Sequence, residues 1–250
     1  MGALVARCLI GLCAAIGAAG APADLLTSAA RTASPVINQQ QGALGVPMQI
    51  ILLLTGLTLL PVLMMSVTPF LRITLVLHFL RQAIGTQATP SNPVLIGLAM
   101  FLSLVVMQPT LQKSYEEGWM PYEKQTLAGD EAWRKGIEPI RGFLVKYVRE
   151  KDVQMLLDVS HTAPPTKAGD LEFRILMPAY VLSELKTGFQ IGAMLFLPFL
   201  IIDLLVASVT LSVGIVQLPP VMVSSPFKIL LFVLVDGWNL VAGSLVRSFY

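Results

Sequence analysis

Four long stretches that carry almost no charge set the limits on what this sequence can fold into. Met48 to Leu71 and Pro93 to Leu111 contain no charged residue, Gly188 to Val216 contains only Asp203, and Phe227 to Phe249 contains three charged residues. About 20 apolar residues are enough for a helix to cross the roughly 30 Å hydrocarbon core of a bilayer. The pattern therefore predicts an all-α membrane protein with four apolar helical segments.

The composition of these segments leaves the nature of their surroundings open. Pro61, Pro69 and Pro198 lie inside them, and a proline within a helix removes a backbone hydrogen bond and kinks the helix. Gly, Ser and Thr are frequent, as they are where helices pack closely on one another. We therefore expect kinked helical hairpins that are covered either by lipid or by neighbouring subunits of an assembly.

The charged residues are concentrated in one part of the chain. Of the 17 basic and 15 acidic residues, 23 lie between Lys113 and Lys186. The chain is 13% charged and 55% hydrophobic, whereas a soluble domain carries about 25% charged residues. These values exclude an ordinary cytosolic enzyme and a disordered tail, and the lack of a clustered basic face excludes a nucleic-acid-binding module.

Residues 112–186 are predicted to form a polar helical domain. Pro139 is well placed to start a helix, and five apolar residues follow it at spacings of three and four: Ile140, Phe143, Leu144, Tyr147 and Val148. The flanking residues are assigned to a first apolar hairpin, 46–111, and to a second apolar hairpin, 187–250.

Residues 1–23 have the form of a secretory signal peptide. A positive start, a short apolar core and a small-x-small site favour cleavage after Ala23. Cys8 and Cys13, the two cysteines of the chain, both lie in this segment. The mature chain is therefore expected to lack disulfides and cysteine metal sites. Residues 24–45 are predicted to be a flexible lead-in.

The distribution of Lys and Arg predicts the orientation in the membrane. The segment from Arg72 to Asn92 is interpreted as a loop, and it carries Arg72 and Arg81 but no acidic residue. The positive-inside rule places such a loop in the cytoplasm. With a cleaved signal, the polar segment 112–186 is then periplasmic.

The sequence shows no recognisable catalytic, cofactor or metal site. Asp203 and Asp236 lack the surroundings of an intramembrane aspartyl protease, residues 85–90 lack the lysine of a phosphate-binding loop, and His78 and His161 lie in separate segments. We expect no enzymatic activity and no cofactor. A proton-coupled small-solute transporter stays an alternative, because intramembrane acids often mark proton paths.

Asp203 and Lys228 are the most informative charges in the apolar segments. They lie on consecutive apolar helices that a turn containing Pro219 and Pro220 joins. An isolated charge in such a setting costs several kcal/mol. We therefore predict an ion pair within the hairpin or across a subunit boundary, and we expect a double charge swap to restore assembly. Two separately snorkelling side chains are the alternative. Asp236 is interpreted as a packing residue of the hairpin.

Several runs of residues resemble the FliP family of flagellar type III export-gate proteins, and together they cover about residues 46–250. The similar runs are 70–73 and 80–87 in the first loop, 90–111 in the second apolar segment, 178–192 and 198–208 at the two family signatures, and 218–220 and 226–238 in the C-terminal hairpin.

The resemblance implies a function that composition does not show. It implies a pore-forming subunit of a helical-ring export channel, which passes unfolded rod, hook and filament proteins across the bacterial inner membrane at the flagellar basal body. It also implies several copies of the chain, the partners FliQ and FliR, and the neighbouring proteins FlhA and FlhB. The equivalent subunit of a virulence injectisome is similar and stays an alternative.

The loop before the Pro-Pro turn departs from the family. The family commonly has methionines there as a flexible gasket, whereas this chain has Ile215, Val216 and Gln217, followed by Leu218. Methionine adapts to changing shapes, and Ile and Val are stiffer at χ1. The resemblance predicts an apolar pore constriction at these four residues, with a gasket that is less adaptable than one of methionines.

Overall fold

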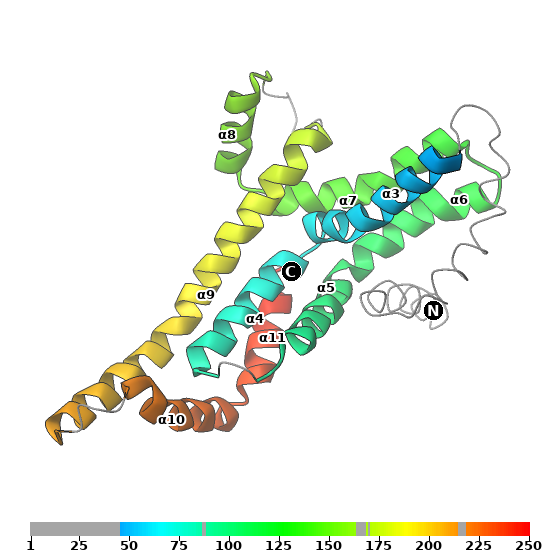
Figure 1. The fold of residues 1–250 in the computed structure, drawn as a ribbon. Helices are drawn as coiled ribbons and strands as arrows, with labels where there is room; N and C mark the ends of the chain where they lie inside the picture. Colours follow the sequence, from blue (N-terminus) through cyan, green and yellow to red (C-terminus); the bar gives the residue numbers. More distant parts are fainter. Residues whose placement is uncertain (1–45, 87–88, 164–168, 170, 215–218) are drawn as a thin grey trace. The chain divides into compact units, whose positions relative to one another are not determined.

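The computed structural model describes residues 46–86, 89–163, 169, 171–214 and 219–250, and it divides into two units between Leu60 and Pro61. The regular structure of these residues is helical, which confirms the predicted all-α class (Figure 1). The elements in chain order are α3 (Val46–Val67), α4 (Phe70–Ile84), α5 (Asn92–Ser114), the π-helix η2 (Tyr115–Trp119), α6 (Met120–Glu123), α7 (Gly129–Tyr147), α8 (Glu150–Ser160), α9 (Phe173–Ser212), α10 (Pro220–Leu234) and α11 (Gly237–Arg247).

Within the described residues, three helical stretches are long and apolar enough to cross a membrane. They are Pro47–Val67, Asn92–Glu123 and Phe173–Ser212. The last apolar segment of the sequence is not one straight helix, because α10 and α11 meet at a bend of 66°. Asp236 stands at this bend with φ of 50°, a left-handed conformation that interrupts helical geometry. The candidate spans number four if the bent pair counts as one.

The core is built on α4 and α9, which lie side by side and run in the same direction (Figure 1). The buried face of α4 repeats at spacings of three and four, with Ile73, Val76, Leu77 and Leu80 fully buried. Gly192 of α9 allows the two helices to approach closely, because a Cβ atom there would lie 2.4 Å from a ring carbon of Phe79, a partly buried α4 residue.

Residues 72–92 were expected to form a loop, and this expectation was wrong. Most of them belong to α4, and Arg72 is buried in the core. The pattern was misleading because the apolar stretch from Met48 to Leu71 looks continuous in sequence, whereas α3 ends at Val67 and Pro69 precedes a new helix.

The polar segment is helical as expected, but its main helix begins earlier. Pro139 was expected near a helix start and instead lies inside α7, which begins at Gly129. The turns before Pro139 pack against η2, where Gly118 and Gly136 meet backbone to backbone. This packing offsets the single backbone hydrogen bond that an internal proline removes.

Ser183 of α9 binds the chain at the start of α8. Ser183 Oγ accepts a hydrogen bond from the backbone N–H of Arg149 at 3.0 Å and lies 2.7 Å from Asp152 Oδ2, to which it can donate. Arg149 is the residue before the first turn of α8 and Asp152 is in that turn, so a serine of α9 holds the N-terminal end of α8.

The boundaries predicted at 111/112 and 186/187 fall within α5 and α9.

Candidate functional site

The structure brings Asp203 and Lys228 into direct contact within one chain. Lys228 Nζ lies 2.6 Å from Asp203 Oδ2, and it also donates a hydrogen bond to the backbone oxygen of Ala83 at 3.1 Å. Ser224 Oγ donates to the other carboxylate oxygen, Asp203 Oδ1, at 2.5 Å. These four residues, called the lysine cluster below, join α4, α9 and α10.

The electrostatics of the lysine cluster explain how a charged lysine is tolerated in the core. The Lys228 side chain is 2% exposed and the Asp203 side chain 26% exposed. Ala83 is in the last turn of α4, where the helix dipole places partial negative charge. The buried ammonium group therefore has a carboxylate and a helix terminus as partners, which offset its desolvation.

A second buried ion pair joins Arg72 of α4 to Glu184 of α9. Arg72 Nε donates to Glu184 Oε2 at 2.8 Å, and Arg72 Nη2 donates to Glu184 Oε1, so the pair is bidentate. The guanidinium carbon lies 4.0 Å from the centre of the Phe249 ring, and Arg72 Nη1 donates to Ser248 Oγ at 3.3 Å. Tyr147 on α7 donates its hydroxyl to the backbone oxygen of Phe249. We call these five residues the arginine cluster.

The arginine cluster holds residues 248–249 against the core. The rings of Phe143, Tyr147 and Phe249 contact one another, with centroids 4.8 to 6.4 Å apart. Residues 248–249, which follow α11, are thus fixed to α4 by a cation–π contact and a hydrogen bond from Arg72 and to α7 by aromatic packing.

The arginine cluster was not predicted from the sequence. Arg72 was interpreted as a loop residue and Glu184 as part of the polar segment. One signal pointed to it, because Arg72 precedes the buried residues Val76 and Leu80 by one and two helical turns and so shares their face. An arginine on an apolar face requires a buried partner.

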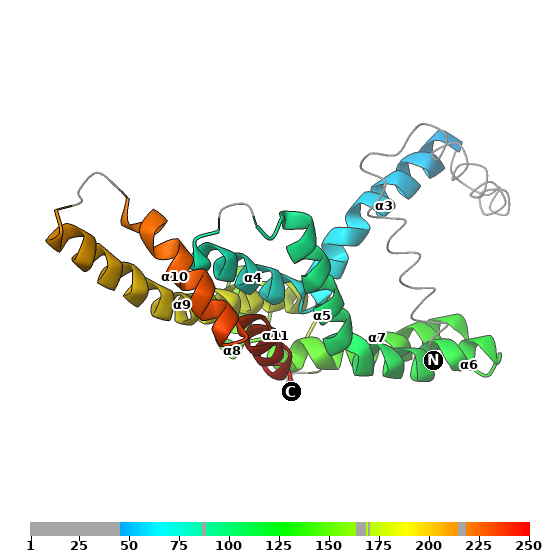
Figure 2. The ribbon, with the colours of Figure 1, turned by 90° about the horizontal axis from the view of Figure 1, so that it is seen from below.

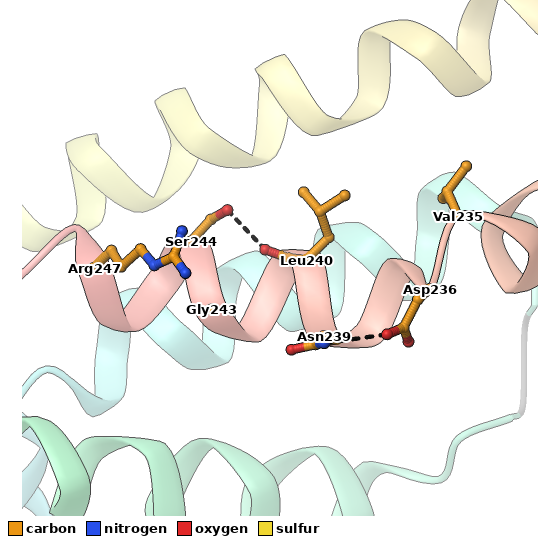
Figure 3. Close-up of a pocket in the computed structure, with 7 residues that line it drawn as sticks. All are labelled: Val235, Asp236, Asn239, Leu240, Gly243, Ser244 and Arg247. Carbon is orange, nitrogen blue, oxygen red and sulfur yellow. Dashed lines mark hydrogen bonds between the residues drawn. The ribbon is translucent and has the colours of Figure 1, made fainter.

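Asp236 is not paired with a cation among the described contacts. Its carboxylate accepts a hydrogen bond from Asn239 Nδ2 at 3.1 Å. It lies at one end of an open groove of about 270 Å³ on α11, and Figure 3 shows the seven residues that line this groove: Val235, Asp236, Asn239, Leu240, Gly243, Ser244 and Arg247.

The remaining predicted positions lie at or beyond the edge of the described residues. Pro219 immediately precedes α10 and Pro220 is its first residue. The predicted constriction, Ile215 to Leu218, and the predicted cleavage site after Ala23 lie outside the described residues. Within the described part of the chain, no group of three or more His, Cys, Asp or Glu side chains could hold a metal ion.

The fold and the two clusters define a class of protein: a helical protein with long apolar helices, in which buried ion pairs hold neighbouring helices together. Comparison with known proteins narrows this class. Residues 53–245 match the model of the FliP family, and the chain therefore belongs to that family. Membership makes it a flagellar export-gate component and not an enzyme.

Flagellar biosynthetic proteins named FliP resemble this chain over most of its length. The protein of Pectobacterium carotovorum is 45% identical over 81% of this chain and 78% of its own length. That of Bacillus subtilis is 46% identical over 80% and 91%, and that of Caulobacter vibrioides 43% identical over 96% and 90%.

Proposed function

We propose that the chain is a pore-forming subunit of the flagellar type III export gate, which passes unfolded rod, hook and filament proteins across the bacterial inner membrane. The observation that carries the proposal is the family match over residues 53–245, a range that contains all residues of the lysine cluster.

The proposed subunit works in an assembly, because much of its apolar surface is uncovered in the single chain. Met194, Leu204 and Leu205 of α9 and Val233 and Leu234 of α10 are each more than half exposed. Surfaces of this kind mark contacts with protein or membrane. We assign them to further copies of this chain and to FliQ and FliR, with FlhA and FlhB as neighbours in the same apparatus.

The lysine cluster is the proposed assembly device. It fixes α10 to α9 and α4, and so sets the spacing of the exposed faces that neighbouring subunits would contact. The chain between α9 and α10 contains residues 215–218, the proposed constriction. A subunit with a misplaced α10 would present this loop wrongly to the channel.

The proposed topology puts residues 112–186 in the periplasm. The predicted signal peptide supports it. Arg81 supports it as well, because its Nη1 donates to Asn92 Oδ1 at 2.6 Å at the start of α5. A basic residue thus lies at the end of α5 opposite residues 112–186, and basic residues favour the cytoplasmic side. Accessibility to a membrane-impermeant thiol reagent tests it after Ser160→Cys is introduced. Labelling in intact cells with a permeable outer membrane is expected, and labelling only after inner-membrane lysis would contradict the topology.

A deletion strain tests the function itself. Loss of the gene should abolish motility and secretion of hook and filament subunits, and the wild-type gene supplied in trans should restore both. Retained motility with loss of secretion of virulence proteins would instead favour an injectisome subunit. Retained motility with loss of uptake of one solute would favour a transporter.

Co-expression with FliQ and FliR tests the proposed partners. Native mass measurement of the purified complex is expected to show several copies of this chain with both small partners. Asp203→Lys should reduce the yield of the complex, whereas Asp130→Lys, a matched reversal at an exposed position in the first turn of α7, should not. A stable monomer as the main wild-type species would contradict the proposal.

A further inference from the structure

Helix α11 follows α10 across a bend of 66° (Figure 2), and contacts at both of its ends fix its direction. At its first residue, a Cβ atom on Gly237 would lie 2.2 Å from ring carbons of Phe232 in α10. The Phe232 ring is 5% exposed, and it packs edge-on against Trp238 with centroids 5.3 Å apart. Beyond the other end, Phe249 is buried in the arginine cluster. The fold therefore holds α11 in one place and orientation.

The open groove of Figure 3 follows one face of this helix. Four of its lining residues are spaced by four, three and four positions: Asp236, Leu240, Gly243 and Arg247. Residues with this spacing stack along one face of an α-helix, and Asp236 belongs to the first turn because its backbone oxygen accepts from the Leu240 N–H at 3.1 Å. We call these four residues the α11 face.

The shape of the α11 face suits a second helix. Side chains on a helix form rows, and the rows of one helix pack into the grooves between the rows of another. Leu240 is 60% exposed, and nothing lies within 4 Å of the Cβ position of Gly243. A residue without a side chain in the middle of such a face allows the backbone of a partner helix to come close.

The two ends of the α11 face carry opposite charges. Asp236 and Arg247 are both exposed, and among the described residues neither has an oppositely charged partner. They are eleven positions apart, or about 16 Å at 1.5 Å per residue. Charge is costly to place in hydrocarbon, so lipid tails are a poor cover for this face. A protein helix can supply a counter-charge at each end.

The charges also set the direction of that helix. Acidic residues stabilise the first turn of a helix and basic residues stabilise the last turn. In a partner that runs antiparallel to α11, an acid in the first turn faces Arg247 and a base in the last turn faces Asp236. The partner can therefore satisfy its own helix ends and the two charges of the α11 face with the same side chains.

The proposed assembly excludes one partner with this pattern, which is α11 of a second copy. Two antiparallel copies of the same helix are related by a two-fold axis, and a contact of that kind closes after two subunits. It cannot link the several copies of the proposed export gate around one channel. The helix that fits the α11 face therefore belongs to a different segment of the assembly.

We propose that the α11 face is a docking site for an antiparallel apolar helix of another chain of the export gate. The partner helix carries an acidic side chain in its first turn, opposite Arg247, and a basic side chain in its last turn, opposite Asp236. The proposal rests on the proposed function, because it requires an assembly. It gives Asp236 a role in recognition in addition to the packing role expected from the sequence.

Site-specific photo-cross-linking in the complex co-expressed with FliQ and FliR tests the proposal. With p-benzoylphenylalanine in place of Leu240, irradiation should join the chain to another polypeptide. Mass spectrometry of the digested adduct should place the label in a helix with an acid followed about eleven residues later by a base. The same probe in place of Val159, which is 74% exposed on α8, should not label that helix.

A charge reversal tests the electrostatic part. Arg247→Glu should reduce the yield of the Leu240-site adduct by about tenfold or more, because like charges then face each other. Arg247→Lys should keep most of the adduct. Reversal of the acid in the labelled helix should restore the adduct in the Arg247→Glu background. An unchanged unfolding temperature of the Arg247→Glu chain shows that the loss is one of docking.

Three results would overturn the proposal. The first is an irradiated complex with no protein adduct at position 240, which means that lipid or water covers the face. The second is an adduct to α11 of a second copy. The third is an adduct to a helix without the two charges, or one whose yield Arg247→Glu does not change. Motility and secretion are measured separately, so each of these results can occur while the proposed function holds.

Discussion

Asp203 and Lys228 are shielded unequally, and this difference sets which substitution harms the chain more. Asp203→Asn leaves an ammonium group that is 2% exposed without its carboxylate, whereas Lys228→Met leaves a carboxylate that is 26% exposed and open to water. We expect Asp203→Asn to lower the free energy of unfolding by about 3–5 kcal/mol and Lys228→Met to lower it by less. Thermal unfolding of the purified chain in detergent measures both, and equal losses would contradict the asymmetry.

The geometry of the lysine cluster also changes the expectation for a charge swap. From sequence, Asp203→Lys with Lys228→Asp was expected to restore assembly. In the structure, an aspartate at 228 would face the backbone oxygen of Ala83, which now accepts from the lysine, and two acceptors repel. We therefore expect the double swap to assemble better than either single reversal and worse than wild type, as measured by the yield of complex with FliQ and FliR. Full recovery would show that the Ala83 contact is unimportant.

Arg72 is expected to tolerate no conservative replacement. Lysine keeps the charge but cannot bond both oxygens of Glu184 or stack its planar group on the Phe249 ring. Arg72→Lys should lower the free energy of unfolding by about 1.5–3 kcal/mol, the usual value of a hydrogen bond to a charged group. The same unfolding measurement applies, with Arg134→Lys, an exposed arginine of α7, as the matched control. A loss no larger than that of the control would contradict a structural role for the bidentate pair.

These residues show what a sequence can and cannot predict about such a site. Asp203 and Lys228 could be proposed as partners because isolated charges in apolar helices need compensation. The contributions of Ser224 and Ala83 could not, since a serine and a backbone oxygen carry no distinguishing pattern. Arg72 and Glu184 are 112 positions apart, and nothing in their spacing indicates contact.

The contact between α4 and α9 depends on small residues, and Gly192 makes the sharpest demand. A Cβ atom at Gly192 would lie 2.4 Å from Cδ2 of Phe79, so Gly192→Ala forces the ring or the helix to move. Overpacking of this kind costs about 1–3 kcal/mol. Gly97→Ala in α5 is the matched control, because nothing lies within 4 Å of its Cβ position, and it should leave stability equal or raise it by about 0.5–1 kcal/mol.

A second substitution identifies the cause of that loss. If the clash with Phe79 is responsible, Phe79→Leu should recover part of the stability that Gly192→Ala removes, and it should lower stability in the wild-type background. Additive effects of the two changes would place the cost of Gly192→Ala elsewhere. Thermal unfolding of the four variants in detergent gives the comparison.

Element boundaries were predictable where one physical signal dominated. The apolar runs gave α3, α5 and α9, since length and hydropathy are enough to identify such helices. The separation of α3 from α4 was missed because Pro61 and Pro69 look alike in sequence, although Pro61 lies inside α3 and Pro69 immediately precedes α4. Pro139 caused the opposite error. It was expected near a helix start, but it lies inside α7, because the packing of α7 on η2 maintains the helix through it.

At the scale of the whole molecule, helix length limits how the chain can meet a bilayer. Helix α9 has 40 residues, which correspond to about 60 Å, roughly twice the hydrocarbon thickness. Its first part carries Arg174, Glu184 and Lys186 and contacts α7 and α8. A helix of this length therefore extends beyond the hydrocarbon on at least one side, so the apolar composition of the chain measures burial in protein as well as in lipid.

The predicted constriction gives a test on the assembled gate. Replacing Ile215, Val216 and Gln217 with glycine removes the side chains that would close the channel, and it should make the inner membrane permeable to small ions. Depolarisation measured with a potential-sensitive dye reports the leak. The leak should vanish when Asp203→Lys is added, because a channel that does not assemble cannot conduct. A leak that persists would come from misfolded chains, and unchanged conductance in the glycine variant would place the barrier in a different part of the gate.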